Sequence, residues 1–346
     1  MAADRIRVTA PGGDYDIHIA EGILGNISQY VPKGKTVVIT NTTLAPLYGE
    51  KLVQGLPDAA IATMPDGEQY KTLETVSKLY VDLVDVGLDR SGTVVALGGG
   101  VVGDTAGFAA ASYMRGLRLV QIPTSLLSMV DSSVGGKVGV DLPQGKNLVG
   151  AFKQPDAVLI DPDVLSTLPE REWRCGMGEI IKHGLLADEG LLAPELWAKD
   201  RAAELVRRAV QVKVDVVQQD PYEKGVRAHL NLGHTFAHAI ERVSHYSWLH
   251  GEAVGVGLVA AARLSSALGM CDSGLAEEVE DIVYKVGLPT RLGDLDAEAL
   301  FAAMGTDKKW QSGHSRFVLL RGMCQPEIVE DVPKATVIQV LKEMAG

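Results

Sequence analysis

The chain has few cysteines and no long hydrophobic run. Cys175, Cys271 and Cys324 are odd in number and share no short spacing, which excludes a disulfide framework or a cysteine-based zinc cluster and indicates a reducing compartment. The longest apolar stretch, residues 253–262, stops at Arg263 and is too short for a bilayer core of about 30 Å. No apolar leader segment is visible, so we expect a cytoplasmic or organellar protein without a secretory signal.

Positive charge is also in deficit. The 33 lysines and arginines stand against 44 acidic residues, which gives a formal net charge of −11. This balance argues against nucleic acid and anionic membranes as general partners. If such a protein binds an anionic small molecule, it must concentrate its cations locally.

The first half of the chain alternates between strand-like and helical patterns. No internal repeat or low-complexity tract is present, and 346 residues exceed the usual size of a single core, so we expect two domains. The β-rich runs cover residues 36–40, 59–64, 93–97, 117–122 and 157–160, and helical patterns cover 45–54, 73–86 and 101–112. This alternation predicts an α/β domain with a Rossmann-like, largely parallel sheet. Residues 5–9 and 15–19 are typical of a separate antiparallel hairpin.

The second half is predominantly helical in pattern. Leu275, Val279, Ile282 and Val283 recur at helical spacing, and one short β-like run covers residues 317–320. We expect the boundary near residues 162–169, with an α/β domain over 1–165 and a mainly helical domain over 166–346.

A glycine-rich turn lies between an expected strand and an expected helix. Residues 98–103 match the pattern G-x-G-x-x-G, in which glycines let the backbone approach a pyrophosphate at a helix N-terminus. The acidic residue that binds ribose about 20 residues downstream is missing. From the residues alone, this turn is either a dinucleotide site or a structural bend.

A second loop, residues 131–137, resembles a phosphate-binding loop but does not match that motif. Asp131 stands where the first glycine belongs, and Val138 replaces the serine or threonine that would contact Mg²⁺, which excludes an ATPase of that type. Residues 113–153 nevertheless carry five cations against two acids. This excess is either a chance surface fluctuation or an anion site.

Histidines cluster in the second half. His234 and His238 are four residues apart, so they share one face of a helix, as paired zinc ligands do. His250 opens an apolar helix, and Glu179 is a lone carboxylate in an apolar helical pattern, a position that is usually paired or metal-bound. The group is either an ordinary set of histidines or a Zn²⁺, Co²⁺ or Fe²⁺ site. Spacing leaves both His234/His238 and His234/His250 open as the ligating pair.

Together and in this order, these motifs resemble the 3-dehydroquinate synthase family of sugar-phosphate cyclases. The matching segments are residues 40–43, 66–71, 98–104, 123–125, 131–137, 146–147, 167–169, 179–182, 231–238, 250–252 and 307–309. The resemblance implies that the metal is held by Glu179, His234 and His250, with His238 on the substrate-phosphate side. It leaves one side of the metal open to substrate hydroxyls.

The resemblance also implies an NAD⁺ site, with its acidic ribose partner upstream of the glycine turn. Its residues are Asn41, Asp66, Gly67, Glu68, Gln69, Tyr70, Lys71, Gly98, Gly99, Gly100, Val101, Val102, Gly103, Asp104, Thr124, Ser125, Lys137, Lys146, Thr167, Leu168 and Glu172.

The implied substrate is a phosphorylated seven-carbon sugar acid. Phosphate contacts fall to Lys137, Asn147, His238 and one lysine of the pair Lys308 and Lys309. The carboxylate clamp falls to Lys213 and Arg227, and ring-hydroxyl contacts fall to Asp131, Lys182 and Asn231. Arg115 matches an arginine contributed by a neighbouring subunit, so we expect a homodimer.

The implied reaction converts 3-deoxy-D-arabino-heptulosonate 7-phosphate to 3-dehydroquinate and phosphate, a lyase step of the shikimate pathway to chorismate and the aromatic amino acids. NAD⁺ is regenerated within the cycle. Val138 and Asp141 depart from the Thr and Asn common in the family, which affects contacts around Lys137. The alternatives are another sugar-phosphate cyclase, a metal-dependent polyol dehydrogenase or a catalytically silent NAD-binding regulator. The carboxylate clamp and the metal ligands favour the first interpretation over these three.

Overall fold

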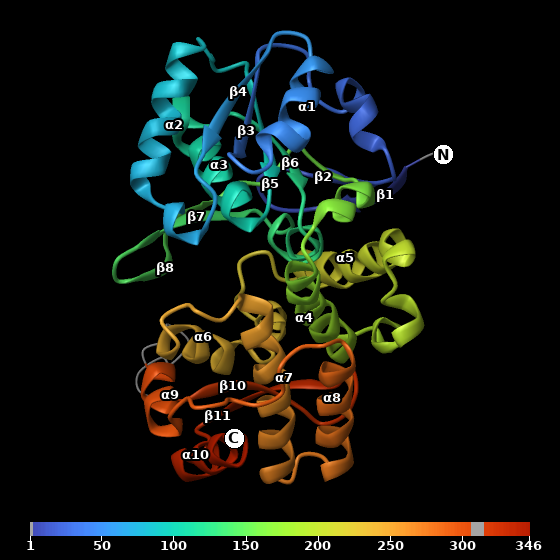
Figure 1. Ribbon diagram of the computed structural model, residues 1–346, viewed down its shortest axis with the longest axis vertical. Helices are drawn as coiled ribbons and strands as arrows, with labels where there is room; N and C mark the ends of the chain where they lie inside the picture. Colours follow the sequence, from blue (N-terminus) through green and yellow to red (C-terminus); the bar gives the residue numbers. More distant parts are fainter. Residues whose placement is uncertain (1–2, 306–314) are drawn as a thin grey trace. The chain divides into compact units, whose positions relative to one another are not determined.

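The computed structural model describes residues 3–305 and 315–346 and divides into two compact units, Met1–Pro169 and Glu170–Gly346 (Figure 1). No helix in the described ranges is both long and apolar enough to cross a membrane.

The first unit contains a seven-stranded sheet of order β1-β2-β9-β6-β5-β3-β4. Every neighbouring pair is parallel except β1 with β2. The strands are β1 (Asp4–Val8), β2 (Tyr15–Ile19), β3 (Thr36–Asn41), β4 (Ala59–Met64), β5 (Thr93–Gly98), β6 (Arg118–Pro123) and β9 (Ala157–Ile160). The expected largely parallel sheet is therefore confirmed.

The N-terminal hairpin is part of this sheet, so the expectation that it stands apart was wrong. Residues of β2 pair in parallel with β9, with Asp16 opposite Ala157 and Ile19 opposite Ile160. Tyr15, Ile17 and Ile19 are buried, and this apolar face is covered only when the hairpin joins the edge of the sheet.

Helices cover both faces of the sheet. Successive residues of a strand point to opposite faces, and the strands are apolar on both, so each face needs a covering layer. On one face, α2 (Leu73–Asp85) and α3 (Gly100–Ser112) pack through Leu79, Leu83 and Ala106 against Val94 and Ala96. On the other, the short helix η1 (Ile23–Gln29) and α1 (Glu50–Gln54) pack against alternate residues of the same strands. The result is a three-layer α/β unit.

The strand order reverses between β3 and β5. The chain passes from β3 outward to β4 and then returns to the other side of β3 as β5. Asn41 ends β3 and Gly98 ends β5. From these two residues the chain leaves in opposite directions, toward β4 and toward β6. In open parallel sheets this switch point, at the carboxyl ends of the strands, is where ligands bind.

A hairpin that was not predicted from the sequence follows the loop that starts at Asp131. Strands β7 (Lys137–Leu142) and β8 (Gly145–Phe152) pair antiparallel, with Lys137 opposite Phe152. Lys137 therefore begins a strand.

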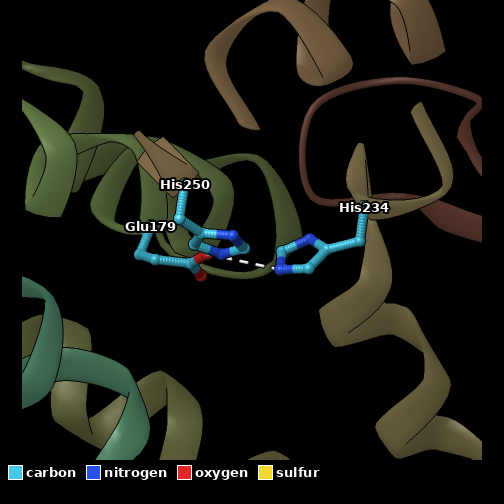
Figure 2. A group of neighbouring side chains, drawn as sticks. All are labelled: Glu179, His234 and His250. Carbon is cyan, nitrogen blue, oxygen red and sulfur yellow. Dashed lines mark hydrogen bonds and ion pairs between the residues drawn. The ribbon is translucent and has the colours of Figure 1, made fainter. Parts of the chain in front are cut away.

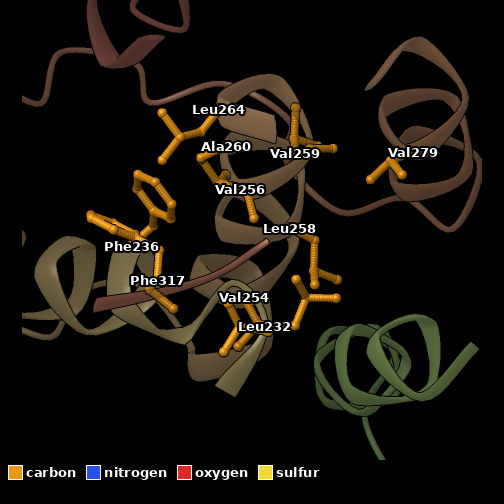
Figure 3. Close-up of a cluster of buried hydrophobic side chains, with 14 of the residues drawn as sticks. Leu232, Phe236, Val254, Val256, Leu258, Val259, Ala260, Leu264, Val279 and Phe317 are labelled. Carbon is orange, nitrogen blue, oxygen red and sulfur yellow. The ribbon is translucent and has the colours of Figure 1, made fainter. Parts of the chain in front are cut away.

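The second unit is mainly helical, as expected, with one two-stranded sheet formed by β10 (Arg316–Leu320) and β11 (Pro326–Glu330). Its α-helices are α4 (Glu170–Leu186), α5 (Ala202–Gln219), α6 (His234–Val243), α7 (His250–Ala267), α8 (Ser273–Lys285), α9 (Ala297–Met304) and α10 (Lys334–Glu343). Helix α7 is apolar on all sides over residues 253–262, and this stretch is buried in the core (Figure 3). Phe236 of α6 packs against Phe317 of β10, with ring centroids 5.4 Å apart.

Candidate active site

Three side chains from three helices of the second unit converge on one point (Figure 2). Glu179 lies in the middle of α4, His234 is the first residue of α6, and His250 is the first residue of α7. One ligand atom from each lies within 4.8 Å of the others. The described structure thus groups the three residues that the family resemblance assigns to the metal.

Close helix packing brings two of these ligands together. A Cβ atom added to Gly251 would lie 2.0 Å from the carbonyl oxygen of Cys175, and one added to Gly178 would lie 2.8 Å from the carbonyl oxygen of Gly251. The backbones of α4 and α7 are therefore in direct contact, which only glycine permits. Glu179 and His250, which follow and precede these glycines, are placed side by side as a result.

Both imidazoles direct the same nitrogen at the same carboxylate oxygen. Nε2 of His234 lies 3.3 Å from Oε1 of Glu179, and Nε2 of His250 lies 3.2 Å from it. The other carboxylate oxygen forms an ion pair with Lys182, one turn further along α4. Glu179 and Lys182 are both fully buried, so each needs this charged partner.

The surroundings keep Glu179 ionised. Burial raises its pKa, but Lys182, His234 and His250 lower it by more, and the pKa of Glu179 lies well below its usual range. Burial lowers the pKa of His234 to about 4, so this ring is neutral. Burial also lowers the pKa of His250, but hydrogen bonds to Glu179 and Glu241 outweigh it and raise that pKa to about 10. His250 is thus protonated in the metal-free protein and must lose a proton to become a ligand.

The far nitrogens of both rings also have partners. Nδ1 of His234 lies 3.2 Å from the carbonyl oxygen of Leu232, and Nδ1 of His250 lies 3.5 Å from Oε1 of Glu241. Glu241 was not among the site residues predicted from the sequence. The signal that exposed Glu179, a carboxylate within an apolar helical pattern, was also present seven residues after His234.

This arrangement fits a divalent cation. Two imidazole nitrogens and an ionised carboxylate form the ligand set of many catalytic zinc sites, which leave a further position open. His238 lies one turn along α6, and its ring meets the ring of His234 edge-on at 5.6 Å. The second histidine that contacts Glu179 is His250. Sequence spacing alone could not decide between His250 and His238 for this position.

Further polar residues of the second unit lie on α5 and on the short helix η10 (Val226–Asn231). Lys213 on α5 and Arg227 on η10 are buried. The guanidinium of Arg227 donates to the carbonyl oxygen of Pro221 at 2.5 Å, and the amide of Asn231 donates to Glu223 at 2.8 Å. Glu172 lies in the first turn of α4. Lys308 and Lys309 fall outside the described residues.

In the first unit, several residues expected to bind NAD⁺ lie at the carboxyl ends of the parallel strands. Asn41 ends β3 and donates to Asp66 at 2.8 Å, and Asp66 also accepts from Thr43 at 2.7 Å. Gly98 ends β5, and Gly100 begins α3 without a side-chain cap from Gly99. The first backbone amides of α3 therefore lack a side-chain acceptor from the residue that precedes the helix, which is the condition under which a helix N-terminus binds phosphate.

A cluster of charged residues around the buried Lys71 links two segments of the first unit. Lys71 forms an ion pair with Asp104 at 2.6 Å and donates to Asn147 at 2.7 Å. Lys146 pairs with Glu68 at 3.3 Å. Burial is the largest influence on Asp104 and raises its pKa to about 6, although Lys71 opposes the shift. The structure thus connects the 66–71 segment to the β7–β8 hairpin.

The remaining residues of the first unit are placed singly. Thr124 follows β6 and donates its backbone amide to Gly98 at 3.0 Å. Thr167 accepts or donates a 2.6 Å hydrogen bond with Tyr48. Other positions are Ser125 beside Ser128, Asp131 in the helical turn Ser128–Ser132, Leu168 after the turn Pro162–Thr167, and Arg115 at φ 69 in the turn Tyr113–Arg115.

Similarity to known proteins extends over nearly the whole chain. Family models for the 3-dehydroquinate synthase N-terminal and C-terminal regions match residues 61–175 and 176–310. The 3-dehydroquinate synthase of Cyanothece sp. is 43% identical over 98% of both chains. That of Bordetella pertussis is 46% identical over 92% of this chain and 93% of its own.

Solved structures with this fold include two other cyclases. A 2-deoxy-scyllo-inosose synthase complexed with carbaglucose-6-phosphate, NAD⁺ and Co²⁺ has a TM-score of 0.88 and 25% identity over 99% of this chain and 100% of its own. A 2-epi-5-epi-valiolone synthase from Streptomyces hygroscopicus with NAD⁺ and Zn²⁺ has a TM-score of 0.89 and 28% identity, over 98% and 99%. A probable glycerol dehydrogenase from Sinorhizobium meliloti, 17% identical over 94% of both chains with a TM-score of 0.65, shares only the fold. Since both family models and near full-length relatives agree, the chain belongs to the 3-dehydroquinate synthase family.

Proposed function

We propose that this chain converts 3-deoxy-D-arabino-heptulosonate 7-phosphate to 3-dehydroquinate and phosphate, a step of the shikimate pathway, with NAD⁺ and one Zn²⁺ or Co²⁺ ion. The observation that carries the proposal is the group Glu179, His234 and His250 in a chain that is 42–46% identical to curated 3-dehydroquinate synthases. The relatives that act as other cyclases are 25–28% identical, which makes their reactions the weaker alternative.

The metal would be held by Glu179, His234 and His250. The ionised carboxylate and the neutral His234 are already suited to a cation, and His250 exchanges its proton for it. When bound, the metal supplies Lewis acidity at a substrate hydroxyl, and NAD⁺ supplies the acceptor and later the donor of a hydride. Lys182, which forms an ion pair with Glu179, would donate to a hydroxyl next to the ion.

The dinucleotide would lie at the switch point between β3 and β5. The amide groups that begin α3, next to Gly99 and Gly100, would bind its pyrophosphate. Asp66 and Glu68, which lie upstream of the glycine turn, are the acids available for ribose hydroxyls. Because Asp66 is already oriented by Asn41 and Thr43, it would offer a fixed acceptor.

The substrate would be recognised by its two anionic groups. Lys213 and Arg227, two cations that are both buried, would clamp the carboxylate. Lys137, Asn147, His238 and Lys308 would hold the phosphate. Asp131 and Asn231 would contact ring hydroxyls, and positioning by these groups would supply much of the rate enhancement.

We further infer a cytoplasmic homodimer in which Arg115 reaches the neighbouring subunit. Met114 and Arg115 are both exposed and both have a left-handed backbone, with φ of 51 and 69. Strained backbone on an exposed turn is typical of functional segments, which supports a role for this turn.

The test is a stoichiometry assay on the purified full-length chain with NAD⁺ and Zn²⁺. Phosphate released from 3-deoxy-D-arabino-heptulosonate 7-phosphate and absorbance of NADH are followed together. We expect many phosphates per enzyme without net NADH. Stoichiometric accumulation of NADH would favour a polyol dehydrogenase, and turnover of glucose 6-phosphate in place of the sugar acid would favour another cyclase.

A further inference from the structure

One face of α6 carries three ionisable side chains. His234, His238 and Glu241 follow one another at intervals of four and three residues, so they share a helical face. Glu241 is only 3% exposed. A carboxylate removed from water in this way requires a strong donor.

The donor is the second histidine of the metal group. Oε1 of Glu241 lies 3.5 Å from Nδ1 of His250, and Nε2 of the same ring lies 3.2 Å from Glu179. Glu241 therefore contacts the nitrogen that faces away from Glu179. In the neutral ring, an Nδ1–H directed at Glu241 leaves the lone pair on Nε2, where a cation would bind.

The two histidines differ in what holds them. His234 has the carbonyl oxygen of Leu232 at its Nδ1, a neutral acceptor two residues away in the sequence. His250 has the carboxylate of Glu241, which belongs to another helix. An anionic acceptor makes an imidazole a stronger metal ligand and fixes its ring more firmly than a neutral one does.

The segment between α6 and α7 also forms hydrogen bonds with Glu241. Its backbone carbonyl accepts from the amide of Tyr246 at 2.7 Å and from the hydroxyl of Ser244 at 3.2 Å. His245 and Tyr246 have left-handed backbones, with φ of 52 and 60, and the chain there turns back toward α7. The backbone carbonyl of Glu241 thus helps to hold the loop that leads to His250, while its carboxylate contacts the ring of His250.

We propose that Glu241 is a positioning residue that orients His250 and strengthens it as a metal ligand. Through it, α6 contributes to both histidine ligands, one directly and one by way of this carboxylate. The inference rests on the proposed metal site and adds a residue to it that does not contact the ion.

The test measures Zn²⁺ affinity by competition with a chromophoric chelator, using the full chain freed of metal and without substrate. Glu241→Gln keeps an oxygen acceptor of the same size but removes the charge, and Glu241→Ala removes both. Glu277→Gln is the matched control, since Glu277 is an exposed residue of α8 in the same unit. We expect Glu241→Gln to weaken Zn²⁺ binding about 10- to 100-fold, Glu241→Ala to weaken it at least as much, and the control to stay within about twofold of wild type.

Two further readouts separate positioning from a purely structural role. The visible absorption of the Co²⁺ form should change in Glu241→Gln, because the strength of one ligand has changed. Thermal unfolding of the metal-free variants reports whether the fold is intact, and the isosteric Gln variant serves if Glu241→Ala does not fold. A Glu241→Gln protein that binds Zn²⁺ within about twofold of wild type and has an unchanged Co²⁺ spectrum would overturn the inference.

His250→Ala distinguishes this failure from failure of the metal site. If His250→Ala loses the ion while Glu241→Gln keeps full affinity, only the role of Glu241 is wrong. If His250→Ala also keeps the ion, the proposed ligand set is wrong and the inference falls with it.

Discussion

Each unit of this enzyme holds a carboxylate against a buried lysine, and the pKa values of the two carboxylates shift in opposite directions. Asp104 in the first unit pairs with Lys71, yet burial raises its pKa to about 6. Glu179 in the second unit pairs with Lys182, and its pKa lies well below the usual range although burial alone would raise it.

The difference comes from the other neighbours. Glu68 and Asp131 add negative charge near Asp104 and raise its pKa further. Glu179 instead faces two imidazoles as well as its lysine. One buried carboxylate therefore remains an anion that suits a cation, whereas the other is close to taking up a proton. A buried acid beside a lysine does not by itself identify a metal ligand.

The largest expected effect comes from neutralising each carboxylate in turn. Glu179→Gln should lower Zn²⁺ affinity by more than the roughly 100-fold typical for residues that only support a ligand, because it removes the anion at the centre of the group. Asp104→Asn, the same chemical change in the other unit, should leave Zn²⁺ affinity unchanged. Chelator competition on both metal-free proteins checks this, and equal losses would remove the distinction drawn between the two acids.

Close backbone contact provides the next comparison. In Gly251→Ala the new Cβ would lie 2.0 Å from a backbone oxygen of α4, whereas in Gly98→Ala it would lie 2.5 Å from the side chain of Val102. A backbone atom yields less easily, so we expect Gly251→Ala to cost about 3 kcal/mol or more and Gly98→Ala about 1–2 kcal/mol. Denaturant unfolding of the metal-free proteins measures both, and a larger loss for Gly98→Ala would contradict this view of α4 and α7.

Asp104 should also make the stability of the protein depend on pH. Its pKa rises from 3.8 to about 6 on folding, so the folded state holds its proton more tightly. The stabilisation is fully present below pH 3.8 and is lost as the pH rises through 6, on the order of 3 kcal/mol. Asp104→Asn removes this dependence. The measurement is the free energy of unfolding of wild type and of Asp104→Asn between pH 4 and 7, without NAD⁺. As the pH rises, wild type should lose stability relative to Asp104→Asn. A difference between the two proteins that stays constant over this range would show that the pKa is not raised.

Much of the fold followed from local patterns. The buried runs of the parallel sheet and the periodic helices α2 and α3 begin and end within one residue of the expected positions, because complete burial imposes a clear hydrophobic pattern. The β7–β8 hairpin was missed because residues 137–152 are rich in glycine and polar residues. The pairing of β2 with β9 joins residues about 140 apart, which no local pattern encodes.

The site was less accessible from the residues alone. Histidines at an interval of four predicted a shared helical face correctly, but His250 reaches His234 from a different helix, so spacing could not choose between His238 and His250. Glu241 was missed for the same reason, since its contact with His250 is made between helices. The choice of ligands came from resemblance, and the described geometry groups the same three residues.

The assignment of Glu179, His234 and His250 as the metal ligands can be tested directly. Metal content of wild type, His250→Ala and His238→Ala, measured by elemental analysis after dialysis against Zn²⁺ and removal of free ion, tests it. We predict one ion per chain in wild type and in His238→Ala, with turnover lost in the latter, and almost none in His250→Ala. Metal lost from His238→Ala and kept by His250→Ala would contradict the account.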